Sequence, residues 1–449
     1  MCLERSEIGA SMKDYFYRVT GSLDKMIASG EVYTCFFEAE DSDFVRLNQT
    51  RFRQAGSVVQ RQMSVDLIAG RQHATGTVTL TGNLPDDRAC VGELLRLLRK
   101  QRAALPADPY LLYALEPQCT EDIAPAAVPD AGTAVTEIMD MAAGIDLVGI
   151  WASGTLYRGF ANSLGQRNWY VQPSFHFDWS CFNQNGQATK DSYAGTHWEP
   201  TRLAQKLDAA RVQLELLKRK AWNLKPGRYR TYLTPAAVQE LFELVAWDGF
   251  GLKSHRTQQT PLIKLVQRQA RLHPGVTLYE HHTGGLAPRF TASGYTKPER
   301  VTLVRDGLYD QCLVSPRSGM EYGEPVNAGS EVPESLELGA GEITKDTVLE
   351  QLDTGLYVSH LWYCNFSDRN DCRITGMTRY ACFWVQDAAI IAPFSAMRFD
   401  DSLYHLFGDK LLGLTIERER LFSADTYYQR STQSTLLPGA LIEEFNLTL

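Results

Sequence analysis

Apolar and polar residues alternate along several short stretches near the N-terminus, and this alternation limits what the chain can fold into. The stretches are residues 32–37, 44–47, 58–68 and 77–80. Successive side chains of a strand point to opposite faces, so alternation is typical of antiparallel sheets that bury one face. Gly or Asp residues separate the stretches and favour turns between them. We therefore expect a meander of short strands in this region.

Similar strand-like stretches return later in the same half of the chain. They cover residues 147–152, 156–162 and 168–179, with turn residues at 163–165 and 183–186. Apolar residues spaced three and four apart predict helices instead, at residues 12–29, 86–102 and 201–222. Residues 121–132 are rich in Ala, Pro and Asp without any periodicity, which indicates a surface connection.

A helix with clear start and stop signals begins the second half. Thr234 can cap the first backbone N–H groups, Pro235 suits the first helical position, and Gly249 and Gly251 can end the helix. A short strand at residues 228–233 precedes it. The pattern predicts a strand that leads directly into a well-defined helix.

The main domain boundary is expected at the Lys-Pro-Gly turn of residues 225–227, just before that strand. A chain of 449 residues is too long for one core to grow efficiently, so more than one domain is expected. We predict an N-terminal domain over residues 1–224, with a candidate sub-boundary near residues 116–135, and a C-terminal domain over residues 225–449.

The second half reads as strands and loops with few helices. We expect a strand, an Asp306-Gly307 turn and a second strand over residues 300–315, then a helix over residues 345–353 ended by Gly355. Further strands are predicted at residues 356–360 and 373–380, a hairpin at 383–390 and a helix near 402–407. Strand runs and helices are segregated more than they alternate, which predicts the α+β class.

Composition excludes several functional classes. The formal net charge is −8, with no excess of Lys and Arg, so nucleic acid is not the expected partner. No stretch approaches 18 uncharged apolar residues and the first residues are charged, so we expect neither a membrane partner nor a signal peptide, and predict a cytoplasmic protein. The nine cysteines are an odd number without a Cys-x-x-Cys pair, which argues against a disulfide framework. Phosphate-loop, dinucleotide-binding and nucleophile-elbow motifs are missing.

The order of several short motifs resembles the TldD/PmbA family, once called modulators of DNA gyrase. The motifs are Asn-Ser-Leu-Gly at residues 162–165, Asp306-Gly307, Thr375-Gly376 and Phe-Trp-Val-Gln-Asp at residues 383–387. None is specific alone, and Asn-Ser-x-Gly and Asp-Gly recur in β-rich proteins because they suit turns, but the order of the motifs resembles the family over most of the chain. The resemblance implies a two-domain TldD/PmbA-like fold, with an N-terminal α/β domain and a strand-rich, metallopeptidase-like C-terminal domain. It also implies a dimeric, usually heterodimeric, cytoplasmic peptidase that acts on unfolded peptides.

The family's catalytic subunit holds zinc with two histidines of a His-Glu-x-x-x-His motif and a cysteine near the C-terminus, while the glutamate polarises water. Here Glu243, Leu244 and Asp248 stand at those helix positions, and residues 430–435 contain no cysteine. The resemblance therefore implies that this chain has no catalytic residue, no metal ligand and no cofactor of its own. It resembles the PmbA/TldE-type subunit, whose metal-bearing, TldD-type partner carries the zinc.

Other residues could hold a metal, and simpler roles are expected for them. Glu243 and Asp248 are five residues apart on a helix, rotated by roughly 140° from one another, and are expected to be solvated charges. His281 and His282 are expected in a polar loop after a strand at residues 276–279. His360 and Cys364 are expected to pack together in a strand.

Peptide binding by strand addition would explain broad selection of unfolded chains, because any extended backbone offers hydrogen bonds. Two edge strands are expected, at residues 331–338 and 373–380; the first contains Pro333, which is tolerated mainly at edges. The corresponding candidate substrate-binding residues are Glu334, Leu336, Arg373, Thr375 and Gly376.

Three functions remain open at this point. The chain could be the metal-free subunit of a zinc peptidase heterodimer that encloses unfolded peptides, or a stand-alone homodimer that binds peptides or regulates without cutting them. It could also be an enzyme with an unrecognised site built from His281, His282 or carboxylates. Binding of a His-Glu-x-x-x-His partner would favour the first, and turnover by the isolated chain the third.

Overall fold

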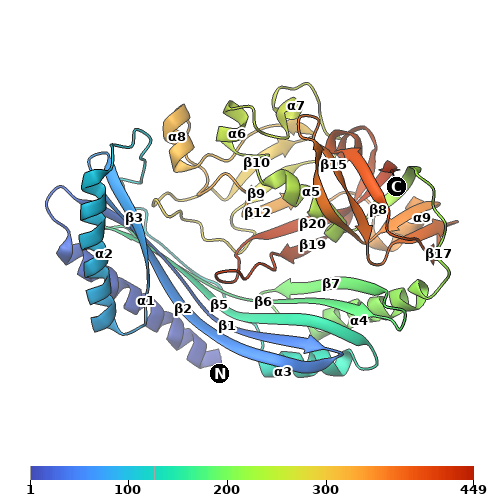
Figure 1. The fold of residues 1–449 in the computed structure, drawn as a ribbon, viewed down its shortest axis with the longest axis horizontal. Coiled ribbons are helices and arrows are strands. Elements are labelled where there is room, and N and C mark those ends of the chain that lie inside the picture. Colours follow the sequence, from blue (N-terminus) through green and yellow to red (C-terminus); the bar gives the residue numbers. More distant parts are fainter. Residues whose placement is uncertain (1, 126, 449) are drawn as a thin grey trace.

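Two large sheets dominate the computed structural model, which describes residues 2–125 and 127–448, with side chains from residue 11 onward. The first sheet has seven strands, all before residue 224, and the second has thirteen, all after it. The N-terminal sheet forms a curved arc, with α1, α2 and α3 on its outer side and the C-terminal half on its inner side (Figure 1). The α+β class is confirmed.

The first sheet is mainly antiparallel, in the order β3-β2-β1-β5-β6, and both β4 and β7 pair with β6. Its strands are β1 (Val32–Asn48), β2 (Arg51–Ala69), β3 (Gln72–Thr79), β4 (Thr120–Ile123), β5 (Asp146–Asn162), β6 (Arg167–Phe182) and β7 (Ala188–Gly195). β4 lies within the stretch proposed as a sub-boundary, yet it pairs in parallel with β6 and so belongs to the same sheet.

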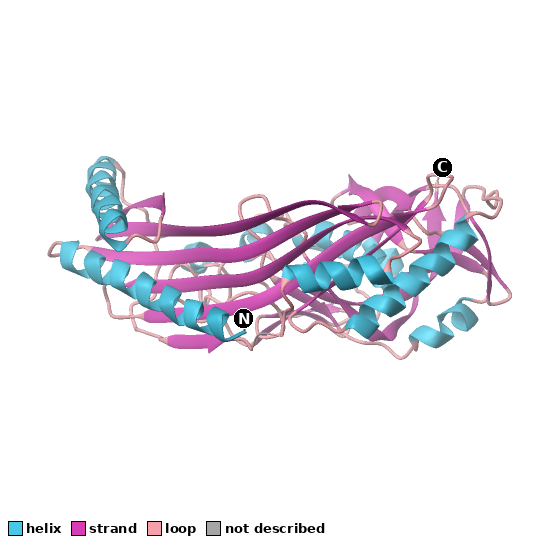
Figure 2. Ribbon diagram, turned by 90° about the horizontal axis from the view of Figure 1, so that it is seen from below, coloured by secondary structure: helices cyan, strands magenta, loops and turns pink. Residues whose placement is uncertain are grey.

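Four helices accompany this sheet and lie across one face of its strands (Figure 2). They are α1 (Cys2–Met26), α2 (Leu84–Ala104), α3 (Ala131–Met141) and α4 (Pro200–Leu217). Two apolar cores form beneath them: one contains Phe16, Phe37 and Trp169, and the other contains Trp151 and Phe177. None of the described helices combines the length and the apolar composition needed to cross a bilayer.

The predicted short strands of this half are in fact longer. Residues 32–37 and 44–47 belong to the single strand β1, and residues 147–152 and 156–162 to β5. The charged stretch within β1 looked like a break, but Glu40 and Ser42 are buried there and bind Arg430 of a distant loop. Gly154 lies within β5 and does not form a turn. A Cβ at this position would lie 2.1 Å from the Asp41 carbonyl oxygen, so a glycine here allows β5 to approach β1 closely.

The second sheet continues with β8 to β20. The strands are β8 (Gly227–Leu233), β9 (Leu278–His281), β10 (Arg300–Arg305), β11 (Leu308–Tyr309), β12 (Ser335–Leu338), β13 (Gly355–Val358), β14 (His360–Asp368), β15 (Arg373–Arg379), β16 (Phe383–Gln386), β17 (Ala389–Pro393), β18 (Arg398–Ser402), β19 (Leu411–Phe422) and β20 (Ser434–Leu447). β20 is the hub of this sheet, because it pairs with β8, β12, β18 and β19.

Short helices surround the second sheet. They are α5 (Pro235–Ala246), α6 (Leu252–Arg256), α7 (Ile263–Val266), α8 (Pro316–Tyr322), the 3₁₀ turn η1 (Lys345–Thr347), α9 (Val348–Leu352) and the π-helical turn η2 (His405–Asp409). The predicted helix over residues 345–353 is thus split in two, and the strand predicted through residue 315 stops at Tyr309. The Asp306-Gly307 turn and the hairpin at residues 383–390 are confirmed.

The loop between β19 and β20 joins the two halves. Arg430 is buried and donates to the backbone oxygen of Ser174 at 2.9 Å and to its hydroxyl at 2.5 Å. Gln429 donates to Glu38, and Gln60 donates to the Tyr428 carbonyl oxygen at 2.6 Å. A segment of the second half is therefore anchored on the inner face of the first sheet.

Candidate functional site

Helix α5 forms as the sequence predicts. The Thr234 hydroxyl accepts from the Ala237 N–H at 3.3 Å and donates to the Ser359 carbonyl oxygen at 2.6 Å, which fixes the start of the helix. At its end, a Cβ on Gly249 would lie 2.3 Å from the Val245 carbonyl oxygen, so only glycine fits. One face of α5 is buried in the core of the second sheet by Ala237, Val238, Leu241, Phe242 and Val245. The opposite face is held rigidly and is free to form a site.

A pocket of about 290 Å³ opens on that face. Its walls come from α5, the residues around β12, and the ends of β19 and β20. The lining residues are Gln239, Glu243, Ala246, Trp247, Val332, Pro333, Leu336, Leu421, Ser423, Gln433, Ser434 and Thr435. The predicted binding residue Leu336 is among them, and segments far apart in the sequence meet here.

The pocket combines polar groups with an apolar wall. The side-chain oxygen of Thr435 is buried without a hydrogen-bond partner within the described part of the chain, whereas the Ser434 hydroxyl points to the other face of β20, beside Gly285. The Gln239 amide donates to the Glu243 carboxylate at 2.6 Å. A buried hydroxyl without a partner favours a ligand that supplies the missing hydrogen bond. The pocket is therefore suited to an extended chain with peptide groups and apolar side chains.

The donor set of this pocket does not fit zinc. Zinc sites in proteins are built from Cys, His and carboxylate ligands, usually with several nitrogen or sulfur atoms. The lining residues include neither histidine nor cysteine, and Glu243 is their only carboxylate. Asp248 is exposed and pairs instead with Arg369, at 2.8 Å between Nη2 and Oδ2. Glu243 and Asp248 are thus not brought together.

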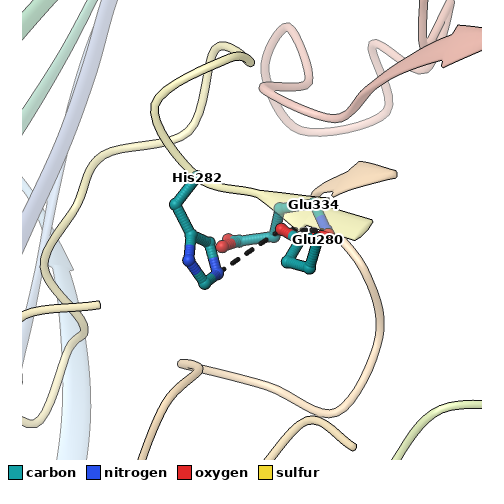
Figure 3. Close-up of side chains that lie close together, drawn as sticks. All are labelled: Glu280, His282 and Glu334. Carbon is teal, nitrogen blue, oxygen red and sulfur yellow. Dashed lines mark hydrogen bonds and ion pairs between the residues drawn. The ribbon is translucent and has the colours of Figure 1, made fainter. Parts of the chain in front are cut away.

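A second cluster of titratable groups lies beside β9 and β12, with two members buried and one partly exposed. It consists of Glu280, His282 and Glu334, whose nearest carboxylate and imidazole atoms lie within 4.8 Å of one another. Figure 3 shows the Glu280 carboxylate between the His282 ring and the backbone nitrogen of Glu334. Glu280 also accepts the Ser335 N–H at 3.0 Å.

The His282 ring has a defined tautomer in this arrangement. Its Nδ1 lies 2.8 Å from the Pro298 carbonyl oxygen, which can only accept, so Nδ1 carries a proton. Nε2 faces the Glu280 oxygen at 3.5 Å. Burial, with the Glu334 charge, raises the pKa of Glu280 to about 7, whereas burial, with the Lys297 charge, lowers the pKa of His282 to about 4. The Glu280 oxygen and His282 Nε2 would both be acceptors if neither carried a proton. A proton on Glu280 therefore removes the repulsion between these two atoms.

The cluster already contains its own cation. Lys297 is only 2% exposed, and its ammonium group forms an ion pair with Glu334. A divalent ion bound to Glu334 would place a second positive centre beside this buried ammonium group. These residues fit a proton-sharing ion-pair network better than a metal centre.

The histidines do not lie where the sequence suggested. β9 extends through His281, so the predicted polar loop begins later. The His281 side chain points away from the cluster, and its Nδ1 lies 2.5 Å from Oε2 of Glu337, whose other oxygen, Oε1, contacts Arg418. His281 and His282 therefore form no common site. His281 is the last residue of β9 and His282 begins the turn after it, and the two rings reach different partners, Glu337 and the Pro298 carbonyl oxygen.

The two predicted edge strands are wrong. β12 lies between β9 and β20, and β15 lies between β14 and β18. Pro333 precedes β12 and so is not part of a strand. Neither strand can accept a peptide by pairing, because both of its sides are occupied.

The predicted residues of β15 are engaged within the sheet. Arg373 pairs with Asp400 at 2.5 Å, and the Thr375 hydroxyl donates to the Phe399 carbonyl oxygen at 2.9 Å. A Cβ on Gly376 would lie 2.7 Å from the Phe399 ring, so glycine allows close packing there. The strands β18 and β20 separate these residues from Glu334 and Leu336.

Sequence reasoning missed Ser434, Thr435 and Lys297. The two hydroxyl residues lie in an ordinary polar stretch, and only the parallel pairing of β20 with β12 brings them to α5. Glu280 lies in β9 and His282 in the turn directly after it, so only their separation of two residues in the sequence could have indicated that they lie close together.

Comparison with known proteins places this arrangement in a family. Residues 226–449 match the family model described as the PmbA/TldA metallopeptidase C-terminal domain. No curated protein sequence gives a match. Among solved structures, TldE from Thermococcus kodakarensis is similar, with 12% identity, a TM-score of 0.75 and coverage of 96% of this chain and 100% of that one.

Two bacterial structures described as candidate modulators of DNA gyrase are similar over nearly their full length. The one from Thermotoga maritima has 14% identity, a TM-score of 0.72 and coverage of 97% of this chain and 100% of that one. The one from Bacteroides thetaiotaomicron has 13% identity, a TM-score of 0.70 and coverage of 99% of each chain. With the metallopeptidase domain in its second half and this fold along its length, the chain belongs to the TldD/PmbA family.

Proposed function

We propose that this chain is the metal-free subunit of a TldD/PmbA-type zinc peptidase. In this role it binds unfolded peptides and encloses them for cleavage by a TldD-type partner that carries the zinc. The proposal includes a cytoplasmic location and a heterodimer. It excludes catalysis by this chain alone.

One observation carries the proposal: the pocket on α5 has no histidine or cysteine in its lining, yet it has the character of a binding site. The unpartnered hydroxyl of Thr435 can bond a peptide group, and Leu336 and Leu421 offer apolar contacts. The family domain supports a role in peptide metabolism, and the donor set supports dependence on a partner for the metal.

The test is metal content and casein cleavage, measured for the purified chain alone and mixed with a His-Glu-x-x-x-His partner. Zinc and chelator-sensitive cleavage are expected only in the mixture. A partner whose motif glutamate is changed to glutamine serves as the control and should bind zinc and this chain without cleaving.

Stoichiometric zinc with cleavage by the isolated chain would overturn the proposal. Self-association with peptide binding, but without any effect of the partner, would favour the homodimeric alternative. Metal-independent turnover by the isolated chain would instead direct attention to Glu280 and His282.

A further inference from the structure

The first sheet has a strand edge that is left open. β1 pairs with β2 along its whole length, whereas β3 pairs only with residues 62–69 of β2. Along residues 51–61, the outer side of β2 has no strand beside it in the described part of the chain. β2 can be followed past β3 towards α3 in Figure 1. An open edge of this length is a template for another strand.

The direction of the backbone groups on this edge follows from one hydrogen bond. The Arg61 carbonyl oxygen accepts the Leu80 N–H at 2.9 Å, so Arg61 directs its backbone groups outward. Alternate residues of a strand face the same way, and the register with β1 is regular from Arg61 to Gln54. Val59, Ser57 and Ala55 therefore also present an N–H and a carbonyl oxygen to an incoming strand.

A pocket with a partly apolar wall adjoins the same edge. It has a volume of about 530 Å³ and lies between the end of the β1–β2 hairpin and α3. Phe52, Val135 and Met139 contribute to its wall, and Phe52 is 57% exposed. Asp43 and Asp130 also line the pocket, so a carboxylate of the bound segment has to lie towards Arg51 and Arg53 and not in the pocket. A strand added beside β2 would direct every second side chain to this face of the sheet, where the pocket can receive one.

Charge determines which partner suits the edge. Residues 51–61 contain Arg51, Arg53 and Arg61 and no acidic residue. Within the described chain, no ion pair involves Arg51 or Arg53, and both are exposed. Two exposed guanidinium groups without ion-pair partners at one end of the edge favour a segment with carboxylates.

We propose that residues 51–61 of β2 capture an extended, acidic peptide segment as an added antiparallel strand, with one of its apolar side chains in the pocket beside α3. The inference rests on the proposed peptide-binding function and gives it a second location, separate from the pocket on α5. The captured class is unfolded segments in which an apolar side chain lies close to Asp or Glu. Arg51 and Arg53 bind the carboxylates.

The experiment compares Ser57→Pro with Ser57→Ala. Both lose the bond from the Ser57 hydroxyl to Asp43, which is 2.6 Å long, but only proline removes the outward N–H. Binding of a fluorescein-labelled peptide of alternating Phe, Ser and Glu residues is followed by fluorescence polarisation. Ser57→Ala should bind within about twofold of the original chain, and Ser57→Pro about tenfold more weakly.

A second measurement does not depend on the variant folding. The same peptide N-methylated at alternate residues loses the backbone N–H groups of one edge and should bind the unmodified chain about tenfold more weakly. Equal binding of the methylated peptide, equal binding by Ser57→Pro and Ser57→Ala, or no binding by the unmodified chain would overturn the inference. So would loss of self-association in Ser57→Pro with peptide binding unchanged.

The results distinguish a failure of the capture site from a failure of the proposed function. If mixtures with the zinc-bearing partner cleave casein but peptide binding is unaffected by changes at the edge, only the capture site is wrong. If the edge binds peptide but no mixture cleaves casein, the capture site stands and the subunit role is wrong.

Discussion

The buried pair Glu280 and His282 should compensate each other's response to pH. In the unfolded chain, with pKa values of 4.5 and 6.5, the pair holds one proton between these pH values, on the histidine. In the folded chain, with pKa values of about 7 and about 4, it also holds one proton there, on the glutamate. Folding then moves the proton without changing the number bound, so the pair adds no pH dependence between pH 4.5 and 6.5.

Replacing either residue of the pair should make stability depend on pH through the titration of the residue that remains. In Glu280→Gln, only His282 remains; its folded pKa is lowered, so the folded state binds fewer protons and stability is lost as pH falls from 6.5 to about 4. In His282→Asn, only Glu280 remains; its folded pKa is raised, so stability is lost as pH rises from 4.5 to about 7. Each shift corresponds to a change of about 3 kcal/mol in the free energy of unfolding.

Urea titrations of the original chain and both variants at pH 4.5 and 6.5 test this reasoning. Burial is the main cause of both shifts and neither partner causes the other's, so each shift should survive the substitution. Relative to the original chain, Glu280→Gln should become more stable and His282→Asn less stable as pH rises. Two variants with the same pH dependence as the original chain, or with slopes of the same sign, would refute the opposite pKa shifts of Glu280 and His282.

Two further changes test the packing around this cluster and in the first sheet. Lys297→Met should lower the free energy of unfolding by about 3 kcal/mol, because it leaves the Glu334 charge without its partner. The double variant with Lys297→Met and Glu334→Leu should lose much less. Losses that are additive in urea titrations would contradict a coupled pair. Gly154→Ala should cost about 3 kcal/mol, because its Cβ would meet the Asp41 carbonyl oxygen at 2.1 Å, whereas Gly56→Ala, with no atom within 4 Å, should leave the thermal midpoint nearly unchanged. Equal midpoints for these two glycine variants would show that β1 and β5 can separate there.

Local chemistry predicts the elements of this chain well where the signals are local. Thr234, Pro235 and Gly249 define α5 almost to the residue, because capping and glycine geometry act within a few positions. The Asp306-Gly307 turn follows in the same way. The α+β class also follows, since it depends only on the order of such elements.

Strand length and strand order depend on distant contacts instead. The acidic residues of β1 looked like a break because nothing nearby in the sequence pairs with them; Arg430, which does, lies in the other half. Residues 331–338 looked like an edge because of Pro333, but β9 and β20 flank the strand that follows. The open edge of β2 was equally hidden, since it exists only because β3 is shorter than β1.

The site was partly predictable for the same reason. Glu243 could be placed on an exposed helix face from its position alone. The hydroxyl of Thr435 could not be placed beside it, because only the pairing of β20 in the second sheet brings it there.

The central position of β20 has a consequence for the making of the protein. During synthesis, β8 and β12 leave the ribosome long before β20, the strand that will lie between them. Until β20 is made, the backbone N–H and C=O groups along one side of each strand have no partner strand. The first sheet needs no later strand, so it can form early, although its contacts with Arg430 come last. The nascent second half therefore passes through an extended period with exposed strand edges and an open α5 pocket, during which it depends on protection from aggregation.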